Sequence, residues 1–173
     1  MNILVTGSKG FVGKNLCAVL RQREDIKLFE YDVTNKPGDL DSALEEVDCI
    51  IHRAGVNRPK NTEEFETGNT GSIDEICAKL KVMGRLPKIV LSSSIQAELD
   101  NPYGVSKRGA EKVLEEFAED TGAECVVYRF KNLFGKWCRP NYNSVTATFC
   151  HNIANGLPIQ IFRSPALFSH RTG

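Results

Sequence analysis

A tyrosine and a lysine four residues apart are the residues of this chain best suited to acid–base chemistry. Tyr103 and Lys107 follow Asn101 and Pro102, which are typical of the N-cap and the first position of a helix. Positions i and i+4 share a helix face, so the phenol and the ammonium are predicted to lie together. The cation and the helix N-terminus should lower the pKa of Tyr103 and let it exchange a proton with a carbonyl or hydroxyl oxygen. The alternative is a surface pair without function, because this spacing often arises by chance.

Three consecutive serines follow an apolar run that has the length of a buried strand. Residues 89–91 are Ile-Val-Leu, and Ser92, Ser93 and Ser94 come next. Ligands of parallel sheets bind at the carboxyl ends of strands, so a serine hydroxyl here can hydrogen-bond the oxygen that Tyr103 protonates. In the alternative interpretation the serines only begin a loop.

A glycine-rich segment, residues 6–13, lies between a short apolar strand and a helical pattern. Its GxxGxxG spacing is a variant of the dinucleotide fingerprint. Gly7 permits a sharp turn, Gly10 lets the backbone approach a pyrophosphate, and Gly13 lets the helix pack closely. The N–H groups and the positive dipole end of the helix then face the phosphates. A plain glycine-rich turn is the alternative.

The choice between the two nicotinamide dinucleotides depends on charges near this loop. An acidic residue after the second strand binds a ribose 2′-hydroxyl and favours NAD(H), and Glu30 and Asp32 are candidates. Lys9, inside the loop, can instead pair with a 2′-phosphate. All three can also be solvated surface charges. We favour NADP(H), with NAD(H) as the alternative.

Short apolar runs alternate with helical patterns along most of the chain. Strands are predicted near residues 3–5, 27–29, 49–52, 89–91 and 125–128, with helices between them. This alternation predicts an α/β fold, a Rossmann-type doubly wound parallel sheet with helices on both faces. We expect an NAD(P)-binding domain over residues 1–162, with a helix at 146–155 and a strand at 158–162, and an irregular tail at 163–173.

The composition and charge of the chain give no support for several classes of function. Lys and Arg together number 22, as do Asp and Glu, so the charge gives no support for nucleic-acid or anionic-membrane binding. The six cysteines form no C-x-x-C pair, so no metal site is expected. The first residues resemble a strand rather than a signal peptide, and no apolar run approaches the ~20 residues of a membrane span. We therefore expect a cytoplasmic protein with reduced thiols.

Together these segments resemble the extended short-chain dehydrogenase/reductase superfamily, which includes the NAD-dependent epimerases and dehydratases. The resemblance rests on residues 6–13, 52–55, 91–94, 103–107 and 129–135, and it extends to about Ile161. It implies catalytic roles for Ser94, Tyr103 and Lys107, and a sugar-nucleotide site that includes Asn69, Ser94, Arg129 and Asn132. The expected cofactor-binding residues are Gly7, Lys9, Gly10, Phe11, Val12, Gly13, Asp32, Ala54 and Lys107.

Within this superfamily, residues 54–59, 92–97, 100–104 and 132–145 resemble the reductases of capsular polysaccharide biosynthesis. That resemblance implies NAD(P)H-dependent reduction of a 4-keto UDP-N-acetyl-deoxyhexose, and homo-oligomers are compatible with it. Two departures stand out: Arg53 replaces a residue that is usually apolar, and the chain stops where the superfamily continues into a substrate-binding lobe. The alternatives are a 4-epimerase or dehydratase, or a truncated nucleotide-binding domain that folds but is inactive.

Overall fold

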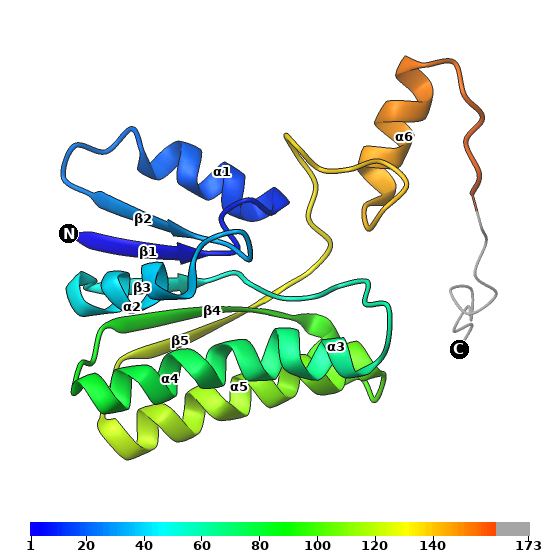
Figure 1. Cartoon of the computed structure of the whole chain (residues 1–173). Helices are drawn as coiled ribbons and strands as arrows, with labels where there is room; N and C mark the ends of the chain where they lie inside the picture. Colours follow the sequence, from blue (N-terminus) through cyan, green and yellow to red (C-terminus); the bar gives the residue numbers. More distant parts are fainter. Residues whose placement is uncertain (162–173) are drawn as a thin grey trace, which may run out of the picture. The chain divides into compact units, whose positions relative to one another are not determined.

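Five parallel strands form one sheet in the computed structural model, which describes residues 1–161 (Figure 1). The strands lie in the order β2-β1-β3-β4-β5, and each neighbouring pair is parallel. Their bounds are β1 Asn2–Thr6, β2 Lys27–Tyr31, β3 Cys49–His52, β4 Lys88–Ser94 and β5 Cys125–Phe130. All five strand predictions and the predicted α/β class are confirmed. The predicted tail, residues 163–173, lies outside the described residues.

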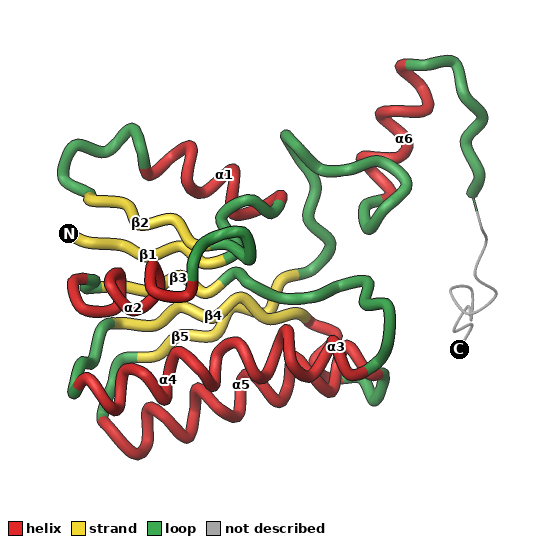
Figure 2. Tube along the Cα trace, viewed as in Figure 1, coloured by secondary structure: helices red, strands yellow, loops and turns green. Residues whose placement is uncertain are grey.

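Helices cover both faces of the sheet, as the doubly wound prediction requires (Figure 2). Helix α1 (Phe11–Leu20) packs through Cys17 against Ile3 and Val5. Side chains alternate along a strand, so Leu4 faces the other way and joins a larger core. That core is closed by α2 (Pro37–Glu46), α4 (Ser72–Met83) and α5 (Pro102–Thr121). None of the described helices has both the length and the apolar character needed to cross a membrane.

Helix α5 starts where the sequence predicted, and its ends have clear physical causes. The Asn101 side chain accepts a hydrogen bond from the Gly104 N–H (2.8 Å), and Pro102 is the first helical residue. Gly122 ends the helix in the left-handed conformation, with φ +76°. Short helical segments were not predicted: α3 (Glu63–Phe65), a π-helical turn (Glu66–Gly71) and a 3-10 turn (Ile95–Glu98).

The chain divides into two compact units, Met1–Trp137 and a second unit that begins at Cys138. The second unit holds α6 (Val145–Ala154), which matches the helix predicted over residues 146–155. The domain boundary predicted at residue 162 stays a prediction. The strand predicted at 158–162 is wrong for residues 158–161, which are irregular. Within the described part of the chain no strand pairs with residues 158–161. Their alternating apolar side chains therefore have no sheet to pack against, and Ile161 is 78% exposed.

The strand order brings the predicted site residues to one edge. Strands β2 and β3 flank β1 on opposite sides, so the chain turns in opposite directions after β1 and after β3. A crevice at the carboxyl ends of strands is expected at such a reversal. The glycine loop follows β1, Arg53 follows β3, and the serines end β4 at this same edge (Figure 1).

Candidate active site

The glycine loop has the geometry of a phosphate cradle. Gly7 has φ +66°, and a Cβ on Gly13 would lie 2.1 Å from the Gly7 carbonyl oxygen, so α1 approaches the loop closely only because both residues lack side chains. No side chain caps the first turn of α1, whose N-cap is Gly10. The N–H groups of Phe11, Val12 and Gly13 are therefore available to an anion, and the loop fits a dinucleotide pyrophosphate.

The charged residues considered for cofactor choice do not all face the loop. Asp32 accepts a hydrogen bond from the Lys9 backbone N–H (2.9 Å), and the Lys9 ammonium contacts the Thr34 hydroxyl. Glu30 is instead held by Arg21 in a bidentate ion pair, at 2.6 and 2.8 Å. The cation and the acid that would favour different cofactors, Lys9 and Asp32, thus lie together beside the glycine loop.

The segment after β3 is tied to the glycine loop. The Thr6 hydroxyl oxygen lies 3.2 Å from the N–H groups of both Arg53 and Ala54, and it contacts Nδ1 of the buried His52 at 2.9 Å. The other ring nitrogen of His52 contacts Ser72 at 3.2 Å. Burial, with the positive charges of Lys107 and Arg53, lowers the pKa of His52 to about 3, so this ring is neutral at physiological pH.

Gly55 has a role that the sequence did not reveal. A Cβ at this position would lie 2.5 Å from Asn69 Oδ1 and 3.0 Å from Lys107 Nζ. Two site residues therefore occupy the space that any larger side chain at position 55 would need. Gly55 belongs to the segment 52–55 that carries the family resemblance. Only the folded structure shows that Asn69 and Lys107 occupy the space next to it.

The three predicted catalytic residues converge at the N-terminus of α5. The Lys107 ammonium is buried, lies 5.9 Å from the centre of the Tyr103 ring and donates to the Ser92 carbonyl at 3.4 Å. Tyr103 shares a side-chain hydrogen bond with Ser94, and its ring packs against Phe65 at 5.8 Å. The structure brings Ser94, Tyr103 and Lys107 together, and their catalytic roles stay predictions.

The acidity of this cluster differs from the sequence-based expectation. Burial raises the pKa of Tyr103 above its usual value, although the hydrogen bond with Ser94 and the positive charge of Arg53 act in the opposite direction. Burial lowers the pKa of Lys107 to about 8, the charge of Arg53 adds to this shift, and Glu111 opposes it. The predicted lowering of the Tyr103 pKa is therefore wrong, because desolvation outweighs the hydrogen bond with Ser94 and the charge of Arg53. Tyr103 is protonated at neutral pH, as a proton donor must be.

Asn69 is fully occupied by contacts within the protein. It lies in the π-helical turn, is 1% exposed, and its Oδ1 accepts from the Val56 N–H at 3.0 Å. Its amide group donates to the Val56 carbonyl at 3.2 Å and to the Ser106 hydroxyl at 2.9 Å. Asn69 thereby fixes the loop after β3 against α5, and its predicted contact with substrate stays a prediction.

The two remaining predicted substrate residues differ in their surroundings. Arg129 pairs with the buried Glu111 at 2.6 Å and with Glu98 at 3.2 Å, which gives it a structural role between β5 and α5. Burial favours the neutral form of Glu111, but hydrogen bonds from Arg129 and Ser93 outweigh this and lower its pKa. Asn132 is exposed just beyond β5. Substrate contacts of Arg129 and Asn132 are not tested by this arrangement.

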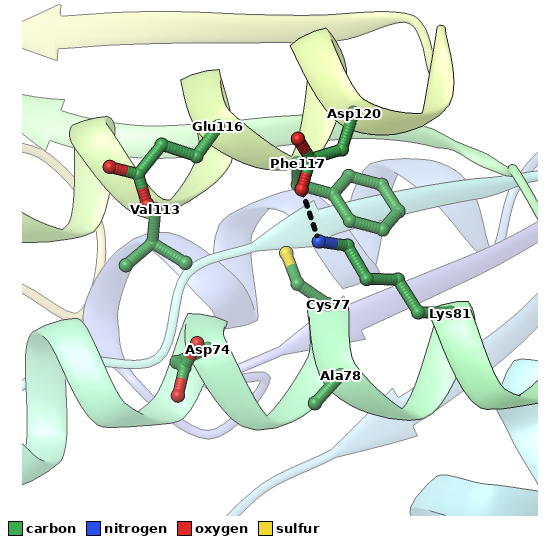
Figure 3. A pocket seen from close by; sticks show the side chains of 8 residues that line it. All are labelled: Asp74, Cys77, Ala78, Lys81, Val113, Glu116, Phe117 and Asp120. Atoms are coloured by element: carbon green, nitrogen blue, oxygen red, sulfur yellow. Dashed lines mark hydrogen bonds and ion pairs between the residues drawn. The ribbon is translucent and has the colours of Figure 1, made fainter.

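A surface groove elsewhere in the molecule lies between α4 and α5 (Figure 3). Its walls include Cys77 and Phe117, which belong to the main core, and the Lys81–Asp120 ion pair spans it at 2.7 Å. The groove belongs to the packing of the two helices rather than to the crevice at the strand ends. Within residues 1–161, no group of three or more His, Cys, Asp or Glu side chains is placed to hold a metal ion.

Comparison with known proteins decides the family. Residues 3–166 match the NAD dependent epimerase/dehydratase family. The chain belongs to this family. It is 48% identical, over 96% of its length, to UDP-2-acetamido-2,6-beta-L-arabino-hexul-4-ose reductase of Pseudomonas aeruginosa, and it covers 45% of that protein. The chain thus spans about half the length of this curated relative. It is also 25% identical to UDP-glucose 4-epimerase of Vibrio cholerae, over 91% of this chain and 58% of the epimerase.

Solved structures agree with this assignment. The capsular polysaccharide assembling protein CapF of Staphylococcus aureus superposes with a TM-score of 0.82 at 48% identity, over 94% of this chain and 43% of CapF. UDP-glucuronic acid 4-epimerase of Bacillus cereus in complex with NAD has a TM-score of 0.80 at 18% identity, over 92% of this chain and 64% of the epimerase. At that identity the likeness shows the fold alone, and the fold is the predicted Rossmann-type one.

Proposed function

We propose that this chain is the nucleotide-binding and catalytic part of an NAD(P)H-dependent reductase that acts on a 4-keto UDP-N-acetyl-deoxyhexose. The observation that carries this proposal is the 48% identity to a UDP-sugar 4-ketose reductase, which extends through the cluster of Ser94, Tyr103 and Lys107. By the same similarity to CapF, the product would serve the synthesis of a capsular or surface polysaccharide. The partner is a sugar nucleotide.

The proposed chemistry divides between the cofactor and this chain. A reduced nicotinamide, when bound, supplies the hydride that adds to carbon four of the keto sugar. The Tyr103 hydroxyl gives its proton to the ketone oxygen, so the carbonyl becomes a secondary alcohol and the tyrosine becomes a phenolate. Ser94 donates a hydrogen bond to the same oxygen. Lys107 holds the nicotinamide ribose, and its ammonium lies 5.9 Å from the centre of the Tyr103 ring.

The preference for NADP(H) is also proposed. Lys9 reaches Thr34 just beyond β2, on the side of the loop where a ribose 2′-phosphate is expected. Asp32 opposes this preference because its carboxylate lies at the same loop and would repel a phosphate. We favour NADP(H) because the Lys9 ammonium is free to move from a hydroxyl to a phosphate, whereas Asp32 is held by a backbone N–H.

A second candidate is a 4-epimerase or dehydratase, which the similarity to the Vibrio cholerae epimerase favours. A reductase consumes one reduced cofactor for each sugar, whereas an epimerase regenerates its own. Stoichiometric oxidation of the cofactor would therefore separate the two candidates. A nucleotide-binding module without activity is the third, and it predicts cofactor binding without turnover.

The test uses this chain and a chimaera in which it replaces the matching segment of the Pseudomonas aeruginosa reductase. Calorimetric titration of the chain should show NADPH binding, weakened in Lys9→Ala while NADH binding is kept. The chimaera should oxidise NADPH in proportion to the 4-keto UDP sugar supplied. Tighter binding of NADH to the unmodified chain would reverse the cofactor assignment, and absence of any dinucleotide binding would overturn the proposed function.

A further inference from the structure

Three residues of α5 each contact one of the three consecutive serines that end β4. They are four residues apart and therefore share one face of the helix. They are Tyr103, Lys107 and Glu111. Tyr103 shares a side-chain hydrogen bond with Ser94. Lys107 donates to the Ser92 carbonyl at 3.4 Å, and Glu111 accepts from the Ser93 hydroxyl. The first two contacts belong to the predicted catalytic residues, whereas the proposed chemistry gives Glu111 no part.

Glu111 is a buried carboxylate that joins α5 to two strands at once. It is 4% exposed. Besides the bond from Ser93, it accepts two hydrogen bonds from Arg129 of β5, with Nε 2.9 Å from Oε1 and Nη2 2.6 Å from Oε2. Ser93 and Arg129 are register partners in the β4–β5 pair, so one carboxylate ties the helix to both strands at the same level. Bidentate pairs of this kind fix geometry as well as adding energy.

The same network also holds the turn that follows Ser94. Ser94 is the N-cap of the 3-10 turn Ile95–Glu98. Glu98, at the end of this turn, contacts Arg129 Nη1 at 3.2 Å. The chain is therefore restrained on both sides of Ser94, before it by Glu111 and after it through Arg129. The Glu98 contact is largely exposed and contributes little by itself, so the arrangement depends mainly on the buried carboxylate.

We propose that Glu111 is a positioning residue that holds the Ser94 hydroxyl against Tyr103 by fixing α5 and β5 to the end of β4. The inference rests on the proposed function in taking Tyr103 as the proton donor and Ser94 as its neighbour on the ketone oxygen. Both groups must reach the same oxygen, and small displacements of either are costly. Arg129 serves the same purpose from β5, because each of its three guanidinium nitrogens is bonded to Glu111 or Glu98.

The first measurement of the test needs no turnover. The chain is labelled with 3-fluorotyrosine, and the fluorine NMR signal of Tyr103 is assigned by its absence in Tyr103→Phe. Glu111→Gln removes the charge that holds Arg129 and keeps the size of the side chain. It should shift the Tyr103 signal in the same direction as Ser94→Ala, which removes the hydrogen bond directly. In the Ser94→Ala background, Glu111→Gln should cause little further shift.

Turnover of the chimaera gives the second measurement. Glu111→Gln should lower kcat by about tenfold, because the proton donor and Ser94 are no longer aligned. The KM for NADPH should not change, since the substitution leaves the glycine loop untouched. In the Ser94→Ala background the same substitution should lower kcat by less than about twofold, because the two residues act as a unit. A substitution that only destabilised the fold would lower kcat by the same factor in both backgrounds.

Controls and alternative variants keep both measurements decisive. Glu116→Gln is the matched control, since Glu116 lies on the same helix in an exposed pair with Lys112 at 3.5 Å, and it should change neither the signal nor kcat. If Glu111→Gln does not fold, Ser93→Ala interrupts the same network and replaces it. An unmoved Tyr103 signal, or equal losses of kcat in the two backgrounds, would overturn the proposal. If the unmodified chimaera does not oxidise NADPH, the proposed function fails, and the fluorine signal still decides whether Glu111 positions the pair.

Discussion

The glycine loop and the Tyr103 cluster lie at the same edge of the sheet, but the loop presents backbone groups and the cluster presents side chains. The loop offers backbone N–H groups from one continuous segment, and its geometry requires the absence of side chains at Gly7 and Gly13. The cluster is made of side chains from β4 and α5, and Asn69 of the π-helical turn holds α5 in place beside them. The loop can therefore be recognised from local spacing, whereas the cluster exists only after distant segments pack together.

The largest effect is expected from Tyr103→Phe, which removes the phenolic hydroxyl group and keeps the aromatic ring. Turnover of the chimaera should fall by about 10²- to 10⁴-fold, the range usual for loss of a general acid. NADPH affinity should stay the same, because the proposed pyrophosphate site is the loop and not the cluster. Steady-state rates and calorimetry measure the two quantities. Tyr31→Phe is the matched control, and full activity in Tyr103→Phe would remove the proposed mechanism.

Gly13→Ala tests the glycine loop. The added methyl group would meet the Gly7 carbonyl at 2.1 Å, so the loop or α1 must shift. We expect lost NADPH affinity and a decrease in the free energy of unfolding of about 1–3 kcal/mol, as for other overpacked sites. Gly38→Ala is the control, because a Cβ there meets nothing within 4 Å. Denaturant unfolding that shows no difference between Gly13→Ala and Gly38→Ala would contradict the close approach of α1.

The smallest effect concerns His52, which contacts Thr6 at the start of the glycine loop and Ser72 at the start of α4. Its pKa is about 3 in the folded chain and near 6.5 when unfolded, so the unfolded state binds more protons between these values. The free energy of unfolding should therefore fall as the pH decreases below about 6.5, by at most about 1.4 kcal/mol per pH unit. Urea unfolding at pH 7.5 and pH 5.5 measures this dependence.

His52→Asn should flatten that pH dependence, because asparagine does not titrate. Glu111 contributes in the same direction only at lower pH, since its lowered pKa makes its stabilisation disappear as the carboxyl group protonates. Between pH 5.5 and pH 7.5 the dependence is therefore dominated by His52, and Lys107, with a pKa of about 8, begins to contribute only at the upper end. An identical slope in His52→Asn and the unmodified chain would mean that His52 is not neutral in the folded protein.

The sequence predicted the elements better than the contacts between them. Strands and helices were recognisable because apolar periodicity and glycine spacing are local, as at Gly7 and Asn101. The high pKa of Tyr103 was not predictable, because it depends on the burial of a ring that Phe65 and β4 cover. The ion pair between Arg129 and Glu111 was missed for the same reason: 18 residues separate the partners in the chain, on different elements.

The predicted strand at residues 158–162 shows the opposite error. Alternating apolar residues such as Ile159 and Ile161 carry a local signal, but a strand needs a neighbour that supplies hydrogen bonds. Ile159 is 39% exposed, and residues 158–161 pair with no described strand. Local pattern is sufficient for an element whose partners adjoin it and insufficient where the partner must come from elsewhere.

The order of the elements along the chain also has a consequence for synthesis on the ribosome. Strands β1, β2 and β3 are neighbours in the sheet, and all three emerge before Tyr103 is translated. The strands and the glycine loop of the proposed dinucleotide site are thus synthesised while the acid–base residues are still unmade. When α5 follows, Lys107 enters the space that Gly55 leaves open, and Ser106 reaches the amide of Asn69. A growing polypeptide therefore contains the whole glycine loop before it contains the residues proposed to transfer a proton.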